Sequence, residues 1–175
     1  MKRLVTFSTS LLVIFSISAF SQNVAVIDTQ AAILQTQVAQ DAFKALEEES
    51  EYSSMVEQAQ QLQNDRQALV ETLQKDAETL SNEGIAELQK DIQEKTADLE
   101  FVLGKIQTKQ NETVQAVATQ LNPAMMQIIN DLFVAKKIQL LLGADKALYF
   151  DGSVSITEQV TDALDGAAAA EPESN

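Results

Sequence analysis

The chain has 175 residues and carries 26 acidic against 12 basic side chains, for a formal charge of −14. Glycine, proline and aromatic residues are scarce, a composition typical of long helices and unlike that of a β sandwich or barrel. The chain has neither cysteine nor histidine, which removes thiolate and imidazole metal sites, disulfides and most nucleophile systems. We therefore expect no enzyme, no metal and no cofactor, and the acidic charge argues against nucleic acid as a partner.

The first residues have the pattern of an export signal. A basic start at residues 1–3 precedes a mostly apolar run over residues 4–20, which has the length of a signal-peptide core rather than of a bilayer span. Small side chains at Ala19 and Ser21 suit signal peptidase, so we predict a signal peptide over residues 1–21 that is cleaved after Ser21. No stable membrane insertion is then expected after cleavage. An uncleaved N-terminal anchor is the alternative.

The next segments predict a short strand and a long helix. Residues 23–28 are rich in β-branched side chains and indicate a strand. Residues 30–80 contain no proline or glycine, and their apolar positions alternate at spacings of three and four, which is typical of a coiled-coil seam. Those positions are Tyr52, Met55, Ala59, Leu62, Leu69, Leu73 and Leu80. Because Arg66 and Asp76 also fall on this seam, we expect it to be imperfect.

A turn signal then divides two helical stretches of similar length. Residues 81–84, Ser-Asn-Glu-Gly, favour capping and turning, and a second seam follows from Ile85 onward with interruptions at Lys95 and Lys109. Matched helices joined by a short turn pack antiparallel, so we predict a helical hairpin arm over residues 30–137 with its tip near 81–84. A continuous rod that forms a parallel dimer is the alternative, since glycine inside a helix costs only ~1 kcal/mol.

The C-terminal part predicts a return to strands. The apolar runs 138–142 and 147–150 are separated by turn residues and indicate two short strands, after which Thr157 caps a brief helix to Leu164. We expect residues 166–175 to form a disordered tail. The predicted fold class is mainly α with a small β body, in which residues 22–165 form one unit and the hairpin brings both chain ends into one sheet. Such a small core suggests self-association.

This arrangement resembles the Skp (OmpH-like) family of periplasmic chaperones. Residues 24–28, followed by Gln30 and Leu34, look like the opening strand and helix start of the family. Residues 138–142, 147–150 and 155–157 look like its closing strands and the motif that begins its last helix. Ser155 stands where the family motif usually has aspartate.

The resemblance implies a periplasmic homotrimer in which the β segments form a central body and the arms enclose a cavity. It further implies ATP-independent holding of unfolded outer-membrane proteins, which prevents their aggregation before membrane insertion. The body residues would then be Val24, Val26, Leu140, Leu142, Leu148 and Phe150. The best-known members are basic, so attraction between basic arms and acidic clients cannot be carried over to this acidic chain.

Several apolar side chains on the arm are candidates for a client-facing surface. They are Tyr52, Met55, Phe101, Val102 and Leu103. Each can instead simply close the seam of the hairpin, although Phe101 fits that role least because Leu99, Val102 and Ile106 already occupy the stripe. The competing interpretation is a structural or scaffolding coiled-coil protein of the cell envelope. The β segments at both ends of the hairpin favour the chaperone, since a spacer needs none.

Overall fold

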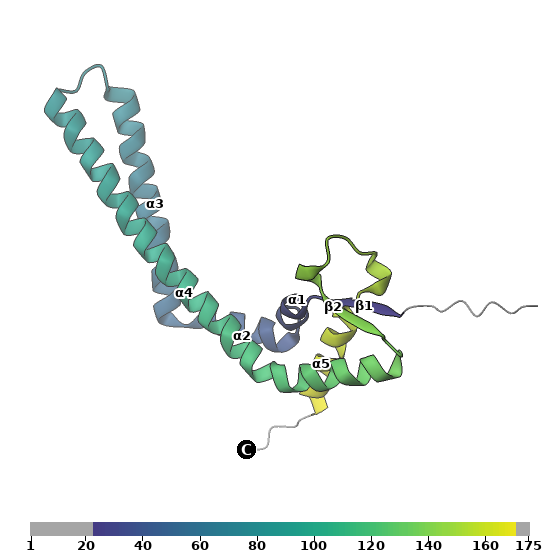
Figure 1. The fold of residues 1–175 in the computed structure, drawn as a ribbon. Helices are drawn as coiled ribbons and strands as arrows, with labels where there is room; N and C mark the ends of the chain where they lie inside the picture. The colour runs from purple at the N-terminus through teal and green to yellow at the C-terminus, as the bar shows by residue number, and fades with distance from the viewer. Residues whose placement is uncertain (1–22, 171–175) are drawn as a thin grey trace, which may run out of the picture.

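The computed structural model describes residues 23–170 and shows a long helical arm that projects from a small body (Figure 1). The predicted signal peptide, residues 1–21, lies outside the described residues. In chain order the elements are β1 (Val24–Ile27), α1 (Thr29–Leu34), α2 (Gln37–Glu48), α3 (Ser50–Asp76), α4 (Asn82–Ala135), β2 (Leu140–Gly143), the 3-10 turns η1 (Ala144–Lys146) and η2 (Gly152–Val154), and α5 (Thr157–Ala170). The predicted fold class, mainly helical with a small β body, is confirmed.

The sheet joins the two ends of the described chain. Strand β1 pairs in parallel with β2, with Val24 beside Leu140 and Ile27 beside Gly143. On the other edge of β1, Val26 bridges Ser155, and the Ile156 amide donates to the Val26 carbonyl at 2.9 Å. The hairpin therefore returns the chain to its starting strand, as the sequence predicts.

The second predicted C-terminal strand, residues 147–150, does not form. These residues lie in a loop between η1 and η2, and Leu148 is fully exposed there. The prediction was wrong: β1 has β2 on one edge and Ser155 on the other, and residues 147–150 do not pair with the outer edge of β2. A strand needs backbone hydrogen-bond partners in a sheet, and this apolar run has none within residues 23–170.

Helix α5 packs against the other elements of the body and stabilises it. Its Val160 and Leu164 are buried in a core shared with α1, α4 and the sheet, to which Ile27, Ile33 and Leu121 belong. The Thr161 hydroxyl donates to the Ala32 carbonyl at 3.0 Å, and the Asp28 amide donates to Thr157 Oγ1 at 3.0 Å. The helix continues to Ala170 instead of ending near Leu164, because alanine has the strongest helix propensity and four alanines follow Gly166. The prediction of a disordered tail over residues 166–175 was therefore wrong for residues 166–170, and residues 171–175 lie outside the described residues.

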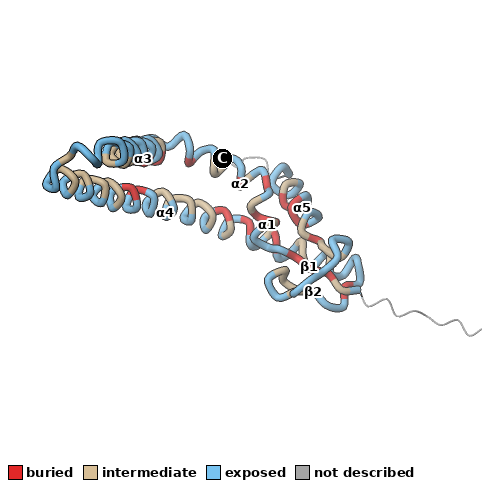
Figure 2. The backbone as a smooth tube through the Cα atoms, turned by 90° about the horizontal axis from the view of Figure 1, so that it is seen from above, coloured by how far each residue is buried: buried red, intermediate tan, exposed pale blue. Residues whose placement is uncertain are grey.

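The arm is an antiparallel pair of α3 and α4, as predicted (Figure 1). Its own small core contains Ala59, Leu62, Leu99 and Val102, with Met55 and Ile106 packed against it. This core is separate from that of the body, and Figure 2 shows buried positions gathered in the body and only short buried stretches along the arm. The arm therefore depends on few apolar contacts.

The predicted helix over residues 30–80 is interrupted twice. Thr36 ends the first interruption, where its hydroxyl accepts from the Ala39 amide at 3.2 Å and donates to the Ile33 carbonyl at 2.7 Å. At the second, Glu49 has extended backbone angles between α2 and α3. Neither break contains glycine or proline, so the seam pattern gives no sign of them.

The tip lies slightly earlier than predicted. The turn spans residues 77–81, and Ser81 caps α4 because its Oγ accepts from the Gly84 amide at 3.1 Å. Gly84 therefore lies in the first turn of α4, not in the turn at the tip. At the other end of the arm, α4 bends where it enters the body (Figure 1), and this helix contains Pro123. Proline lacks the N–H that would bond the preceding turn, and sharp bends in helices usually occur at such a residue.

Helix α4 ends in a Schellman motif that contains an unusual residue. The Ile138 amide donates to the Phe133 carbonyl at 2.9 Å and the Lys137 amide to the Val134 carbonyl at 3.1 Å. Lys137 has a φ of 53°, the left-handed region that normally takes glycine. Replacing Lys137 by glycine is expected to raise the free energy of unfolding by about 0.5–1 kcal/mol, because the steric cost disappears and part of it is offset by chain entropy.

Urea denaturation followed by circular dichroism measures this change. Lys136→Gly is the matched control, since Lys136 has right-handed helical angles and glycine there removes no strain. The control is expected to destabilise by roughly 0.5 kcal/mol. Equal shifts of the two variants in the same direction would contradict the role of the left-handed conformation.

Candidate functional site

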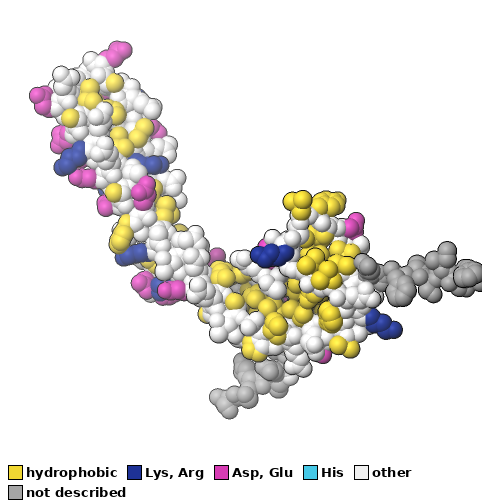
Figure 3. Space-filling view, viewed as in Figure 1, with side chains coloured by type: hydrophobic (Ala, Val, Ile, Leu, Met, Phe, Trp, Pro, Cys, Tyr) yellow, Lys and Arg dark blue, Asp and Glu magenta, His cyan; other side chains and the backbone are white. Residues whose placement is uncertain are grey.

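Exposed apolar side chains occur on both the arm and the body. On the arm they are Val56, Phe101 and Leu103, and on the body they are Met126, Phe133, Val134, Leu140, Leu148, Tyr149 and Phe150. Figure 3 shows apolar groups along the arm and on the protruding loop of the body. These side chains have no buried place in the single chain, so they form the candidate binding surfaces.

The five predicted client-facing residues fall into two groups. Tyr52 and Val102 are buried in the arm, and the Tyr52 hydroxyl accepts a hydrogen bond from Gln110 Nε2 at 2.9 Å. Met55 is half-buried against the same core. These three residues close the seam of the hairpin, which is the alternative role that the sequence allows for them. Phe101 and Leu103 are 65% and 49% exposed and remain available for contact.

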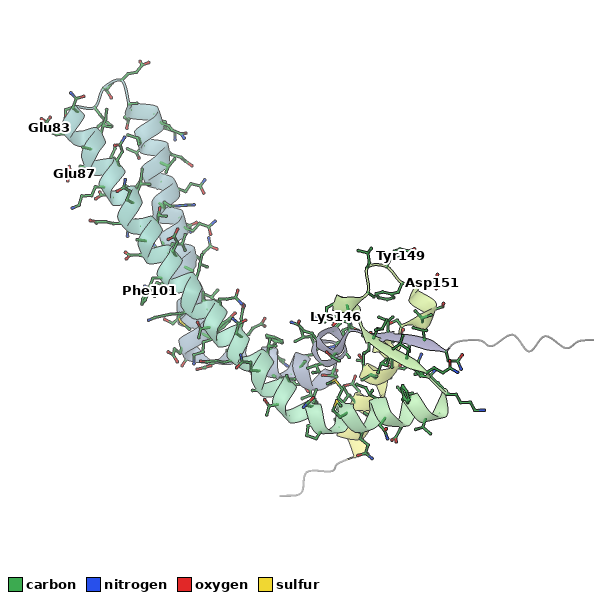
Figure 4. The ribbon with its side chains drawn as sticks, in the orientation of Figure 1. Glu83, Glu87, Phe101, Lys146, Tyr149 and Asp151 are labelled. Atoms are coloured by element: carbon green, nitrogen blue, oxygen red, sulfur yellow. The ribbon has the colours of Figure 1, made fainter. Side chains whose placement is uncertain are left out.

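The two exposed residues lie on different flanks of α4. Successive helical residues are rotated by about 100°, so side chains two positions apart lie roughly 200° apart. Phe101 borders a shallow groove of about 560 Å³ between α3 and α4, together with Met55, Gly104 and Thr108. The ammonium of Lys105 lies 4.5 Å from the centroid of the Phe101 ring, a cation–π distance. Figure 4 shows Phe101 on the outer side of the arm.

The six predicted body residues also differ in their surroundings. Val26 is buried within the chain, and Val24 and Leu142 are half-buried in the sheet. Leu140, Leu148 and Phe150 are exposed. Tyr149, which is not among the six predicted residues, is 91% exposed at the crest of the loop (Figure 4). The sequence signal that could have identified Tyr149 is its position between Leu148 and Phe150, which were both predicted as body residues.

Two charged residues that interrupt the seam are paired across it. Lys95 Nζ lies 3.1 Å from Asp65 Oδ2 of α3. Lys109 Nζ lies 3.1 Å from Glu49 Oε1 and 3.2 Å from Glu51 Oε2, at the break between α2 and α3. These lysines therefore join the two helices at the positions where the apolar seam fails.

The pairing of Lys109 predicts a pH dependence. The hydrogen bond to Glu49, which has the largest effect, and the hydrogen bond to Glu51 raise the pKa of the Lys109 ammonium above its ordinary value of 10.5. A raised pKa in the folded state means that this stabilisation is complete below pH 10.5 and is lost as the pH rises through the folded-state pKa. The difference in melting temperature between the unmodified protein and Lys109→Gln is expected to be constant from neutral pH to pH 10.5 and to shrink above it.

Thermal unfolding at a series of pH values measures this difference. Lys90→Gln is the matched control, because within residues 23–170 Lys90 pairs only with Glu94 of its own helix, at 3.4 Å. The control is expected to have little effect on the melting temperature. A Lys109→Gln difference that stays unchanged from neutral to strongly alkaline pH would contradict the ionic link.

The described residues hold no group of three or more acidic side chains arranged to bind a metal ion. Among the helices in residues 23–170, none is both long and apolar enough to cross a membrane.

Comparison with known proteins gives one family. The model of the family "Outer membrane protein (OmpH-like)" matches residues 23–164. No curated protein matches the chain. Among solved structures, the chain is similar to an OmpH-like protein from Caulobacter crescentus CB15, with 15% identity and a TM-score of 0.44. That match covers 95% of this chain and 92% of the other.

Proposed function

The chain belongs to the OmpH-like family, and we propose that it is a periplasmic holdase chaperone. It binds unfolded outer-membrane proteins without ATP or catalysis and prevents their aggregation before membrane insertion. Its export depends on the signal peptide over residues 1–21, and mass spectrometry of the exported protein tests cleavage after Ser21.

The observation that carries this proposal is the exposure of large apolar side chains outside the seam of the arm. A hairpin that served only as a spacer would need apolar residues in its seam and polar residues elsewhere. Phe101 and Leu103 lie outside the seam and are not covered by the chain. A few separate apolar groups give weak contacts, which suit a chaperone that must release its client without nucleotide hydrolysis.

We also propose that the body assembles into a homotrimer whose arms surround the client. Leu140 and the loop at residues 147–150 are exposed beside the sheet, and within residues 23–170 strand β2 has only β1 as a partner. A sheet edge with unpaired backbone groups and adjacent apolar side chains is suited to pairing with another copy. The trimeric stoichiometry rests on the family resemblance, and light scattering of the purified protein tests it.

The chaperone proposal predicts protection of a client on dilution from denaturant. A urea-unfolded outer-membrane β-barrel protein is diluted with and without the protein, in the absence of nucleotide, and turbidity is followed. The unmodified protein is expected to keep the client soluble. The double variant Phe101→Ser/Leu103→Ser is expected to bind the client about tenfold more weakly, because two apolar contacts are lost.

The matched control is Met126→Ser/Val134→Ser. It removes two exposed apolar side chains from the same helix, but in the body instead of the arm. Light scattering establishes that both variants keep the same assembly. Equal loss of protection in both variants would contradict the arm as the contact surface. If the unmodified protein gave no protection, the chaperone proposal would fail and the envelope spacer would stand.

A further inference from the structure

The groove beside Phe101 has a floor suited to an aromatic ring. Phe101 and the half-buried Met55 supply a ring and a thioether, both of which make favourable contacts with aromatic side chains. One face of the Phe101 ring meets the ammonium of Lys105 at 4.5 Å, and this contact orients the ring. We refer to this surface, formed by Met55, Phe101, Gly104 and Lys105, as the Phe101 groove.

Gly104 is unexplained by the fold of the chain itself. It lies inside the long helix α4, where glycine costs ~1 kcal/mol relative to alanine. A Cβ added there would meet no atom within 4 Å, so no neighbouring element requires the missing side chain. The glycine leaves a notch one helical turn from Phe101, where a side chain from outside can lie flat against the helix.

The charge around the groove is negative. The groove is lined by three acidic residues, Glu51, Glu100 and Glu112, and by two lysines, Lys105 and Lys109. Lys109 already forms ion pairs with Glu49 and Glu51. Within residues 23–170, Glu100 and Glu112 have no ion-pair partner. The surrounding hairpin, residues 50–112, contains 13 acidic and 6 basic side chains. Because Lys109 neutralises Glu51, the unpaired charges that line the groove are the two carboxylates of Glu100 and Glu112 against the one ammonium of Lys105. The balance is negative and favours a cation next to the bound ring.

We propose that the Phe101 groove binds an aromatic side chain that is adjacent to a basic residue in an extended segment of the client. This inference rests on the proposed function, since it names which segments of an unfolded outer-membrane protein the arm selects. Such proteins carry girdles of aromatic residues at both membrane interfaces, so their unfolded chains supply many suitable rings. The acidic rim selects among these rings by the charge of the neighbouring residue.

Three short, unstructured peptides of the same length test this selection. They differ only in a central pair, Tyr-Lys, Tyr-Glu or Leu-Lys, and binding to the full chain is measured by fluorescence anisotropy. The Tyr-Lys peptide is expected to bind about fivefold more tightly than either of the others. At about 0.5 M salt the advantage over Tyr-Glu is expected to vanish while the advantage over Leu-Lys remains, because salt screens charge but not ring contact.

Two variants locate the selection. Gly104→Leu fills the notch and is expected to abolish both preferences, whereas Gln107→Leu adds the same side chain outside the groove and is expected to keep them. Circular dichroism verifies that each variant keeps its helices. The inference is overturned if the unmodified protein shows no preference, or if Gly104→Leu retains it.

The turbidity assay on the same preparations separates this inference from the proposed function. Protection of the β-barrel client without any peptide preference overturns the groove alone and leaves the chaperone intact. Absence of both protection and preference overturns both. Protection together with a preference that Gly104→Leu removes supports both.

Discussion

Replacing Leu164 by alanine is expected to lower the free energy of unfolding of the body by about 3 kcal/mol. Leu164 is 1% exposed and belongs to the core that joins α5 to α1, α4 and the sheet. Shortening its side chain leaves a cavity that the close-packed neighbours cannot fill without moving. The change also loosens the helix whose Thr161 and Thr157 bond the N-terminal segment. Urea denaturation monitored by circular dichroism measures the loss.

Leu103→Ala provides the control for this substitution. It makes the same chemical change on an exposed side chain, and its expected cost is within about 0.5 kcal/mol. A similar loss of stability in the two variants would contradict the buried position of Leu164. If self-association depends on an ordered body, Leu164→Ala is also expected to dissociate at a higher protein concentration than Leu103→Ala.

The periodic parts of the fold were predictable from the sequence. The β-branched run in residues 23–28 contains β1, and the alternation of three and four places Leu62, Leu99 and Val102 in the core of the arm. Both features depend on local periodicity, which one helix or strand records in its own sequence. The hairpin followed from a turn signal between two such seams, although its position was displaced by several residues.

Features that depend on pairing between distant segments were not predictable in this way. Residues 147–150 have the composition of a strand, but a strand forms only where its backbone pairs with another strand, and these residues pair with neither β1 nor β2. The break at Glu49 has no sequence signal of its own, and its carboxylate is bonded by Lys109, 60 positions later. A contact between an acid on one helix and a lysine on the other can be predicted only when the register between the two helices is known.

In the candidate site, too, local features were predictable from the sequence and features that depend on distant contacts were not. Phe101 could be selected because it falls outside the stripe formed by Leu99, Val102 and Ile106, and it is exposed. Tyr52 and Val102 lie on the stripe and are buried, so they are not exposed contact residues. The seam pattern alone does not tell which of its apolar side chains are buried between the two helices. The open space at Gly104 is a property of the packed hairpin, and no local pattern announces it.

Val102→Asp is expected to unfold the arm while the body stays folded. Val102 is 3% exposed in a core that contains only three other buried residues, and an unpaired carboxylate there costs about 4 kcal/mol. Because the arm core and the body core are separate, the loss is confined to α3 and the outer part of α4. Hydrogen exchange is expected to show protection lost over residues 50–112 and kept in α5.

Phe101→Asp is the matched control, since it introduces the same carboxylate one position away on an exposed side chain. Its exchange pattern is expected to match that of the unmodified protein, because the new charge remains in water. Both variants remove one apolar side chain from the arm, but only Val102→Asp removes the ordered arm itself. If holding a client depends on an ordered surface that positions Phe101 and Leu103, Val102→Asp loses protection in the turbidity assay completely and Phe101→Asp loses it in part. Full protection by Val102→Asp with an unfolded arm would assign client binding to the body instead.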